Sequence, residues 1–159
     1  MKNIYDTQIR ISLGLDFSKF LPYTIKFSDI PNIVCSPNKL YSPTQYKNNQ
    51  RKATNFLGFS DLLVFDFDDG WSQELEDFFN QYVGYKIPTR HHMLEKNDII
   101  CERYRIILLV DKPITLNYKE YKRLYKHIIK DLKLDSDTSC VDACRFYYSA
   151  QQFRSLIYF

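Results

Sequence analysis

The chain has 159 residues and a formal net charge of +3, with 45% apolar and 16% aromatic residues. This length fits one domain with a substantial core, and this composition excludes an intrinsically disordered chain. No segment approaches the ~20 consecutive apolar residues that a membrane-spanning helix needs. We therefore expect a single domain over residues 1–159 that does not bind a membrane.

Acidic and basic residues are unevenly distributed along the chain. Residues 53–85 contain seven acids and no Lys or Arg, so the other 12 acids accompany all 22 bases, a formal charge of +10. A basic body around an acidic centre suits a partner with a negatively charged backbone that also needs cations. Ordinary solvated lysines on helix faces would give the same composition.

Alternation and helical periodicity define the expected elements. In chain order they are a strand over 7–15, a long loop with short structured pieces over 31–55, a strand over 62–68, a helix over 73–83, a strand over 85–92, a turn over 94–97, a strand over 102–111, a helix over 118–132 and a closing strand over 145–153. Ser72 caps the first helix and Gly84 follows it, Pro113 ends a strand, and Asn117 with Glu120 resembles a capping box. This order predicts an α+β fold, a mostly antiparallel sheet with helices on one face and the other face free for a ligand.

The strand over residues 62–68 ends in carboxylates. Side chains on a strand alternate, so Asp66 and Asp68 leave the same face. Like charges at neighbouring positions on one face repel each other, which a strand selected only for stability would avoid. A divalent cation removes this repulsion, because it prefers carboxylate oxygens as ligands. The pair therefore predicts a metal site.

The strand over residues 85–92 carries Thr89, Arg90, His91 and His92. A histidine can donate from one ring nitrogen to a phosphate oxygen while a neighbour holds the other nitrogen. The alternative is a semi-exposed pair on a basic strand. A zinc site is not expected, because neither a third His nor any of the four cysteines has suitable spacing.

Arginines and acids follow in the last third of the chain. Arg103 and Arg105 point to the same side of their strand and form a positive patch, with surface salt bridging as the alternative. The segment 134–148 could supply a third carboxylate for two metal ions and a guanidinium fork for a triphosphate. Its candidates are Asp135, Asp137, Asp142 and Arg145. An Asx-rich loop, whose side chains bond local backbone, is the alternative.

The order of these motifs resembles the archaeo-eukaryotic primase superfamily, the primase-polymerases. Members have hydrophobic residues followed by Asp-x-Asp or Asp-x-Glu, then Ser or Thr, any residue and His, and then an Asp after a hydrophobic stretch. Phage- and plasmid-type members also carry an Arg-aromatic-Arg strand, like Arg103-Tyr104-Arg105, and a late run like Asp137-Thr138-Ser139 with Asp142-x-x-Arg145-Phe146. A looser similarity begins at Tyr46, so the resemblance spans about residues 46–148.

The resemblance implies an RRM-like catalytic core, two Mg²⁺ or Mn²⁺ ions and template-directed addition of nucleotides. The protein would be a DNA-dependent nucleotidyltransferase, a primase or primase-polymerase, in the replication of a phage, plasmid or mobile element. Its partners would be a single-stranded DNA template, nucleoside triphosphates and a replicative helicase. Its location would be the cytoplasm of a bacterial host cell or an equivalent compartment.

The resemblance also implies roles for individual residues. The catalytic acids and metal ligands would be Asp66, Asp68 and Asp137, with Asp135 as the alternative third acid. His91 would serve in catalysis and contact the incoming triphosphate, with His92 as its register alternative. The other nucleotide-binding residues would be Arg103, Arg105 and Arg145. The candidates for the template backbone are Lys47, Arg51, Lys52 and Arg90.

Three other functions compete with this interpretation. A rolling-circle nicking initiator would use the His pair and a helix tyrosine (Tyr118, Tyr121 or Tyr125), but adjacent histidines on a strand point to opposite faces. An Asp-x-Asp phosphatase would use Asp66 as its nucleophile. A non-catalytic nucleic-acid-binding relative is disfavoured by the acids, because bare carboxylates repel phosphates.

Overall fold

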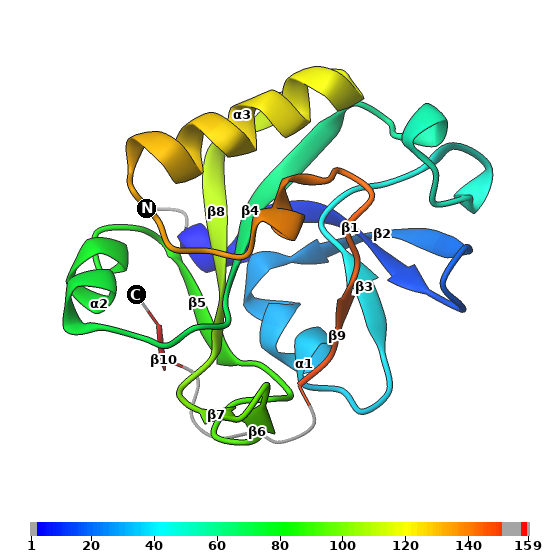
Figure 1. Ribbon diagram of the computed structural model, residues 1–159. Helices are drawn as coiled ribbons and strands as arrows, with labels where there is room; N and C mark the ends of the chain where they lie inside the picture. The colour runs from blue at the N-terminus through cyan, green and yellow to red at the C-terminus, as the bar shows by residue number, and fades with distance from the viewer. Residues whose placement is uncertain (1–2, 151–156, 159) are drawn as a thin grey trace.

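A computed structural model describes residues 3–150 and 157–158 (Figure 1). Within them the chain forms an α+β fold of three α-helices and three antiparallel sheets. The first sheet has the spatial order β2 (Phe20–Lys26), β1 (Gln8–Gly14), β3 (Leu40–Ser42) and β9 (Tyr147–Tyr148). The second has the order β10 (Ile157–Tyr158), β5 (Gly84–Pro88), β8 (Tyr104–Thr115) and β4 (Phe59–Phe67). The third is the hairpin of β6 (Glu95–Lys96) and β7 (Ile99–Ile100).

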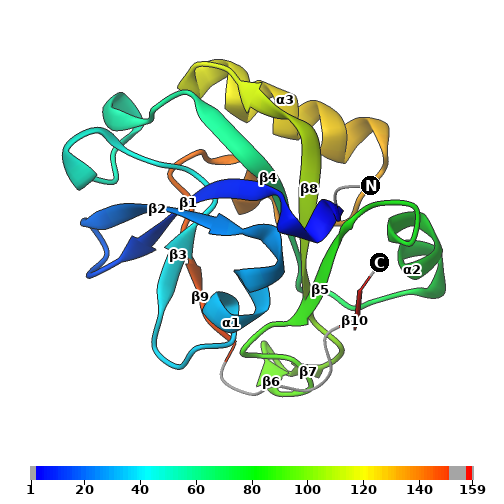
Figure 2. The same cartoon turned by 180° about the vertical axis from the view of Figure 1, so that it is seen from behind.

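Two helices cover one face of the second sheet. The α-helices are α1 (Ile30–Val34), α2 (Gln73–Phe79) and α3 (Tyr118–Asp131). The 3₁₀ helices are η1 (Ile4–Asp6), η2 (Phe27–Asp29), η3 (Lys47–Asn49), η4 (Ala53–Asn55) and η5 (Thr138–Val141). α3 runs across β8 and β4, and α2 lies beside β5 (Figures 1 and 2). Phe65 and Phe67 of β4 pack there with Tyr121 and Tyr125 of α3 and Phe79 of α2.

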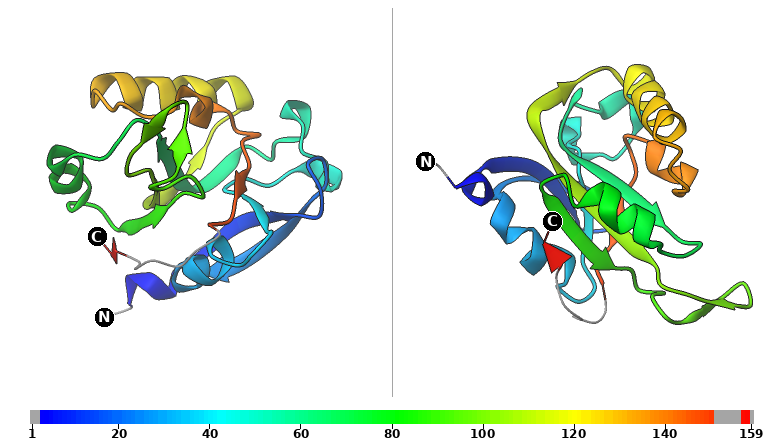
Figure 3. Two further views of the ribbon diagram at one scale, coloured as in Figure 1. Left: turned by 60° about the horizontal axis from the view of Figure 1, so that its bottom comes forward. Right: turned by 90° about the vertical axis from the view of Figure 1, so that its left-hand side faces the viewer.

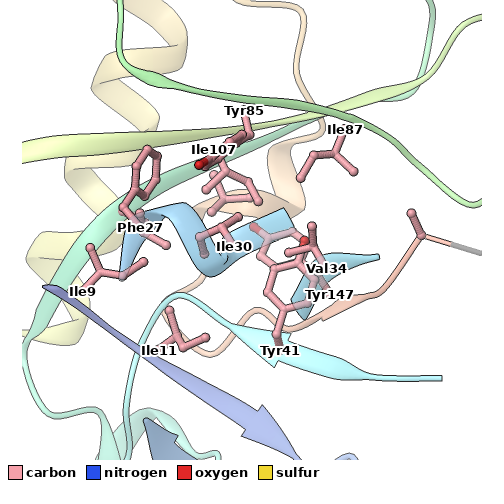
Figure 4. Close-up of a cluster of buried hydrophobic side chains, with 13 residues drawn as sticks. Ile9, Ile11, Phe27, Ile30, Val34, Tyr41, Tyr85, Ile87, Ile107 and Tyr147 are labelled. Atoms are coloured by element: carbon pink, nitrogen blue, oxygen red, sulfur yellow. The ribbon is translucent and has the colours of Figure 1, made fainter. Parts of the chain in front are cut away.

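The other face of the second sheet is covered, so the expectation of a free face is wrong. Leu62, Val64 and Ile107 on this face pack against residues of α1 and the first sheet. Figure 4 shows Ile107 facing Phe27 and Ile30 in this cluster, and Figure 3 shows α1 beside the strands of the first sheet. The side chains alternate between the two faces as predicted, and both faces carry apolar residues, as a sheet buried on both sides requires.

The free edge of β4 is covered by α3 and by the segment around η5. The backbone N–H of Val64 donates to the hydroxyl of Tyr125 at 2.9 Å, and that of Asp66 donates to the thiol of Cys140 at 3.3 Å. The N–H of Asp137 donates to the carbonyl of Asp66 at 2.8 Å. An edge strand has unpaired polar groups that must find partners, and here α3 and η5 supply them.

Several predicted boundaries differ from the structure. The helix predicted over 73–83 ends at Phe79, although its expected cap is present, since the Ser72 hydroxyl accepts from the N–H of Leu75. The strand predicted over 85–92 ends at Pro88, so the histidines lie in a turn. The turn predicted over 94–97 belongs to the β6–β7 hairpin, whose Asn97 and Asp98 have the positive φ that two-residue hairpin loops require.

The strand containing Pro113 continues to Thr115, so the expectation that the proline ends it is wrong. The register of β8 against β4 shifts between Ser60 and Leu62, which places residues 110–113 between paired positions. The missing N–H of a proline is tolerated at such an irregularity. The closing strand predicted over 145–153 is the short β9, and residues 151–153 lie outside the described residues.

The expected first strand, last helix and last capping box are confirmed. The strand over 7–15 is β1, the helix over 118–132 is α3, and Asn117 with Glu120 forms the expected capping box. The four cysteines are free thiols, two of them buried. Among the described residues, no helix has both the length and the apolar character needed to cross a membrane.

The edge contact of Tyr125 gives a stability prediction. We expect Tyr125→Phe to lower the free energy of unfolding by about 1–3 kcal/mol, because a buried N–H loses its acceptor. Tyr82→Phe is the matched control, since this ring is 41% exposed. Urea denaturation followed by circular dichroism measures both changes, and equal stabilities would contradict the proposed contact.

Candidate functional site

The predicted motifs meet at one end of the second sheet, although up to about 70 residues separate them in the sequence. The backbone N–H of Asp137 donates a hydrogen bond to the carbonyl of Asp66. The Arg103 guanidinium donates to the carbonyls of Asp68 at 2.7 Å and His91 at 3.0 Å. Arg105 pairs with Asp66 across β4 and β8. The chain therefore brings its acidic, histidine and arginine motifs to one place.

Asp66 forms a buried ion pair. Its two oxygens accept from Nε and Nη2 of Arg105 at 2.6 and 3.1 Å. The Arg105 Nη1 group also donates to the Tyr41 hydroxyl at 2.9 Å and to the Tyr148 carbonyl at 3.0 Å. Burial lowers the pKa of Arg105, but the charge and hydrogen bonds of Asp66, together with Tyr41 and Tyr147, outweigh burial and the net pKa is raised. Asp66 therefore has both oxygens engaged and is not open to a substrate, which also disfavours the phosphatase alternative.

Asp68 and Asp137 line a pocket of about 390 Å³, called here the Asp68–Asp137 pocket. Asp68 is paired with Lys96 at 2.6 Å, and both side chains are about one-third exposed. Asp137 caps η5 by accepting from the N–H of Ser139 at 2.8 Å, and its carboxylate is 3.6 Å from Arg145. These two acids therefore face the same open volume and have cations beside them.

The Asp137 carboxyl is held in its charged form. Burial raises its pKa, but hydrogen bonds from Ser139 and the charges of Arg145 and Lys96 outweigh burial, so the net pKa is lowered. Asp135 is exposed on the same loop. Asp142 accepts from the N–H of Cys144 at 2.7 Å. Of the three late acids, only Asp137 lines the pocket with Asp68.

The two histidines have different surroundings. The Arg103 N–H lies 3.1 Å from Nδ1 of His92, whose ring packs against Tyr104 with centroids 4.7 Å apart. His91 is half-buried, and burial, Arg90 and Lys96 lower its pKa while Asp68 opposes them. The charges of Asp68 and Lys96 act on His91, but neither histidine lines the Asp68–Asp137 pocket.

Arg103 has a structural position. Its side chain is 2% exposed and donates to five backbone carbonyls, those of Asp68, His91, Leu94, Lys96 and Ile99. Arg103 also lines the Asp68–Asp137 pocket, so the direct contact with a triphosphate expected for this residue stays a prediction. In the structure, Arg103 holds the histidine turn and the β6–β7 hairpin against the end of β4.

Three buried side-chain atoms among the described residues lack a hydrogen-bond partner. They are Oγ1 of Thr89, Oγ of Ser136 and Nε of Arg145. Buried polar groups are normally paired, so such atoms mark places where the protein alone does not satisfy its own chemistry. All three belong to the motifs around the pocket: Ser136 lines it, Arg145 is beside Asp137, and Thr89 begins the Thr-x-His motif.

The residues predicted to contact a template lie outside the pocket. Lys47 and Lys52 are exposed in and beside η3 and η4. Arg51 and Arg90 lie against aromatic rings, with 4.6 Å from the Arg51 guanidinium carbon to the centroid of Phe146 and 4.8 Å from that of Arg90 to Tyr148.

The helix tyrosines of the nicking alternative are mostly core residues. Tyr121 and Tyr125 are buried on α3, and burial raises the pKa of Tyr121 to about 12. Tyr118 is half-buried. Neither buried hydroxyl is placed to attack a nucleic acid.

Sequence reasoning missed three residues of the site. Lys96 pairs with Asp68 but lies in a segment read as a turn. Tyr41 and Cys140 contact the Asp66–Arg105 pair, and burial raises the pKa of the Cys140 thiol to about 12, so it remains protonated. A two-residue hairpin signal at Asn97-Asp98 could have revealed Lys96, whereas the other two depend on long-range packing.

The pocket fits a hard cation only in part. Asp68 and Asp137 offer the oxygen ligands that Mg²⁺ and Mn²⁺ prefer, and Mg²⁺ is commonly bound by one or two carboxylates with substrate phosphates. Within the described residues, however, no three His, Cys, Asp or Glu side chains are close enough to hold a metal ion. Asp66 can join such a group only if its pair with Arg105 opens.

The chain was compared with protein-family models, curated proteins and solved structures. No family model, curated protein or solved structure matches it. The residues and their geometry are therefore the basis for any functional proposal.

The position of Arg103 gives a second prediction. We expect Arg103→Lys to increase amide hydrogen exchange in residues 89–101, because a lysine cannot satisfy five carbonyls in a fixed fork. Arg123→Lys on the exposed side of α3 is the control. Hydrogen exchange read by mass spectrometry tests this, and unchanged protection of 89–101 in the Arg103 variant would contradict it.

Proposed function

We propose that this protein is a DNA-dependent nucleotidyltransferase of the primase-polymerase kind, with an RRM-like catalytic core, that adds nucleotides on a single-stranded template. The observation that supports this proposal most is the convergence of the four motifs at the end of β4, where Asp68, Arg103 and Asp137 line one pocket. Chance acidic or basic runs have no reason to meet in space. The unpaired polar atoms of Thr89, Ser136 and Arg145 lie on the same motifs.

The proposed cofactor is Mg²⁺ or Mn²⁺, held by Asp68 and Asp137. When bound, such an ion supplies Lewis-acid stabilisation of phosphate oxygens and eases deprotonation of a 3′-hydroxyl. Lys96 now neutralises Asp68, so the lysine has to move from this carboxylate toward substrate when a cation binds. A two-ion site additionally requires Asp66 to exchange Arg105 for metal.

The remaining site residues would position the triphosphate. Arg145 is about one-third exposed beside Asp137, so the exposed part of its guanidinium can donate to phosphate oxygens. His91 has a lowered pKa and can donate from a neutral ring. Arg105 and Arg103 contribute indirectly, because they fix the positions of Asp66 and of the histidine turn. These are positioning and electrostatic contributions.

The proposal is tested by primed and primer-free extension on single-stranded DNA with Mg²⁺ or Mn²⁺, with ribonucleotides and deoxyribonucleotides in separate reactions. We expect the wild-type chain to incorporate nucleotide, and Asp68→Asn and Asp137→Asn to lose detectable incorporation, because each removes a charged oxygen ligand. Asp131→Asn at the exposed end of α3 is the matched control.

Asp66 is a poorer first target. Removing one partner of a buried ion pair leaves the other charge uncompensated and destabilises by about 3–5 kcal/mol. Thermal melts must therefore accompany every variant. Incorporation by folded Asp68→Asn and Asp137→Asn chains at the wild-type rate would contradict the proposed function.

A further inference from the structure

An aromatic platform lies outside the proposed catalytic pocket. Phe17, Phe146 and Tyr148 contact one another, with ring centroids 5.7 Å apart for Phe17–Phe146, 6.4 Å for Phe17–Tyr148 and 5.7 Å for Phe146–Tyr148. Phe17 is 58% exposed and Tyr148 is 43% exposed, while Phe146 is half-buried. Large rings exposed as a contiguous group on a chain surface mark an interaction site.

Arginines border this platform at two sides. The Arg51 guanidinium lies over Phe146 and donates to the carbonyls of Phe17 at 2.7 Å and Cys144 at 2.8 Å. Arg90 lies over the ring of Tyr148. These two arginines come from separate segments, and their guanidinium groups lie over two of the three rings, Phe146 and Tyr148.

The surroundings of the platform are basic. The turn that carries Phe17 is joined to the Arg51 segment, since the Arg51 N–H donates to the Ser18 carbonyl at 2.8 Å and Lys19 forms a bridge with Gln50. Lys19 and the neighbouring Lys52 are exposed. One acid, Asp16, lies in the same turn, and its carboxylate accepts from Ser18 and the Lys19 N–H.

We infer that the platform of Phe17, Phe146 and Tyr148 binds a single-stranded nucleic acid by stacking its bases between Arg51 and Arg90. Aromatic rings that stack bases, beside cations that follow the backbone, are the means by which proteins hold single strands without reading sequence. Duplex bases are already stacked on each other, so a platform of this kind favours single strands.

Two hydrogen bonds connect the platform to residues beside the proposed catalytic pocket. The Arg90 Nε donates to Nε2 of His91 at 3.1 Å, and the Tyr148 carbonyl accepts from Arg105, the partner of Asp66. A single-stranded nucleic acid bound on the platform would thus lead toward the end of β4. The inference rests on the proposed function in one respect, that this strand is the template, but binding itself requires neither nucleotide nor metal.

The test is fluorescence anisotropy of a labelled oligothymidine of roughly 16 nucleotides, near the upper end of known site sizes, in EDTA without nucleotide. We expect Tyr148→Ala and Phe17→Ala each to weaken binding about 5- to 100-fold, because each removes one stacking ring. Tyr148→Phe keeps a ring and should bind like the wild type. Tyr23→Ala is the matched control, since Tyr23 is 42% exposed on β2.

The arginines are tested by salt dependence. Arg90→Gln should weaken binding and reduce the slope of log K against log[salt] by about 1, as expected for the loss of one phosphate contact. A duplex of the same length should bind more weakly than the single strand. Melting curves identify any variant that fails to fold. Phe17→Ala should disturb folding least, because Phe17 lies in an exposed turn.

The outcomes separate this inference from the proposed activity. Undetectable binding of the single strand, or equal affinities for wild type, Tyr148→Ala and Phe17→Ala, would overturn the platform whatever the extension assay shows. If binding of the single strand depends on the rings but the chain incorporates no nucleotide, the platform would be supported and the polymerase function contradicted. If the platform variants change neither nucleotide incorporation nor affinity for the single strand, the proposed activity would stand and the platform would be contradicted.

Discussion

The free edge of β4 is the constraint on which the candidate site depends. An edge strand inside a folded chain must satisfy its outward N–H and C=O groups. Here Tyr125, Cys140 and Asp137 supply the partners of Val64 and Asp66. The last of these contacts brings a loop from the end of the chain beside the acidic end of β4. The same hydrogen bonds that close the sheet therefore assemble the site.

The two acids of the Asp-x-Asp motif are electrostatically different. Asp66 is buried and engaged by Arg105, so it is part of the framework that fixes β4, β8 and β9 relative to one another. Asp68, two residues later, lies where the strand has ended, is half-buried, and faces the pocket with Asp137. The repulsion between the carboxylates of Asp66 and Asp68 is thus relieved inside the protein by one arginine and one lysine. Exchange of these cations for metal and substrate is the change that the proposed chemistry demands.

The sequence predicted those features that depend on local patterns. The alternation of Leu62–Phe67, the cap at Ser72 and the capping box at Asn117 each rest on neighbouring residues, and each is found. The sequence also predicted a site at the end of this strand with a late acid beside it, and Asp137 is the one late acid of the three candidates that lines the pocket with Asp68.

Long-range packing decided what the sequence could not predict. The covered second face of the sheet depends on α1 and the first sheet, whose residues are distant in the sequence both before and after the strands they cover. The burial of Arg103 among backbone carbonyls depends on how the β6–β7 hairpin folds back. The exposed platform combines residues 17 and 146–148, which no local pattern connects.

The most direct measurement of the central claim is paramagnetic broadening of ¹H–¹⁵N NMR signals during titration with Mn²⁺. If the end of β4 and the η5 loop form one cation site, the amide signals of Asp68, Asp137 and Thr138 should broaden together at the lowest Mn²⁺ concentrations, ahead of those of the acidic helix α2. The effect should be absent in Asp68→Asn. Broadening confined to α2, or none near Asp68 and Asp137, would contradict the account.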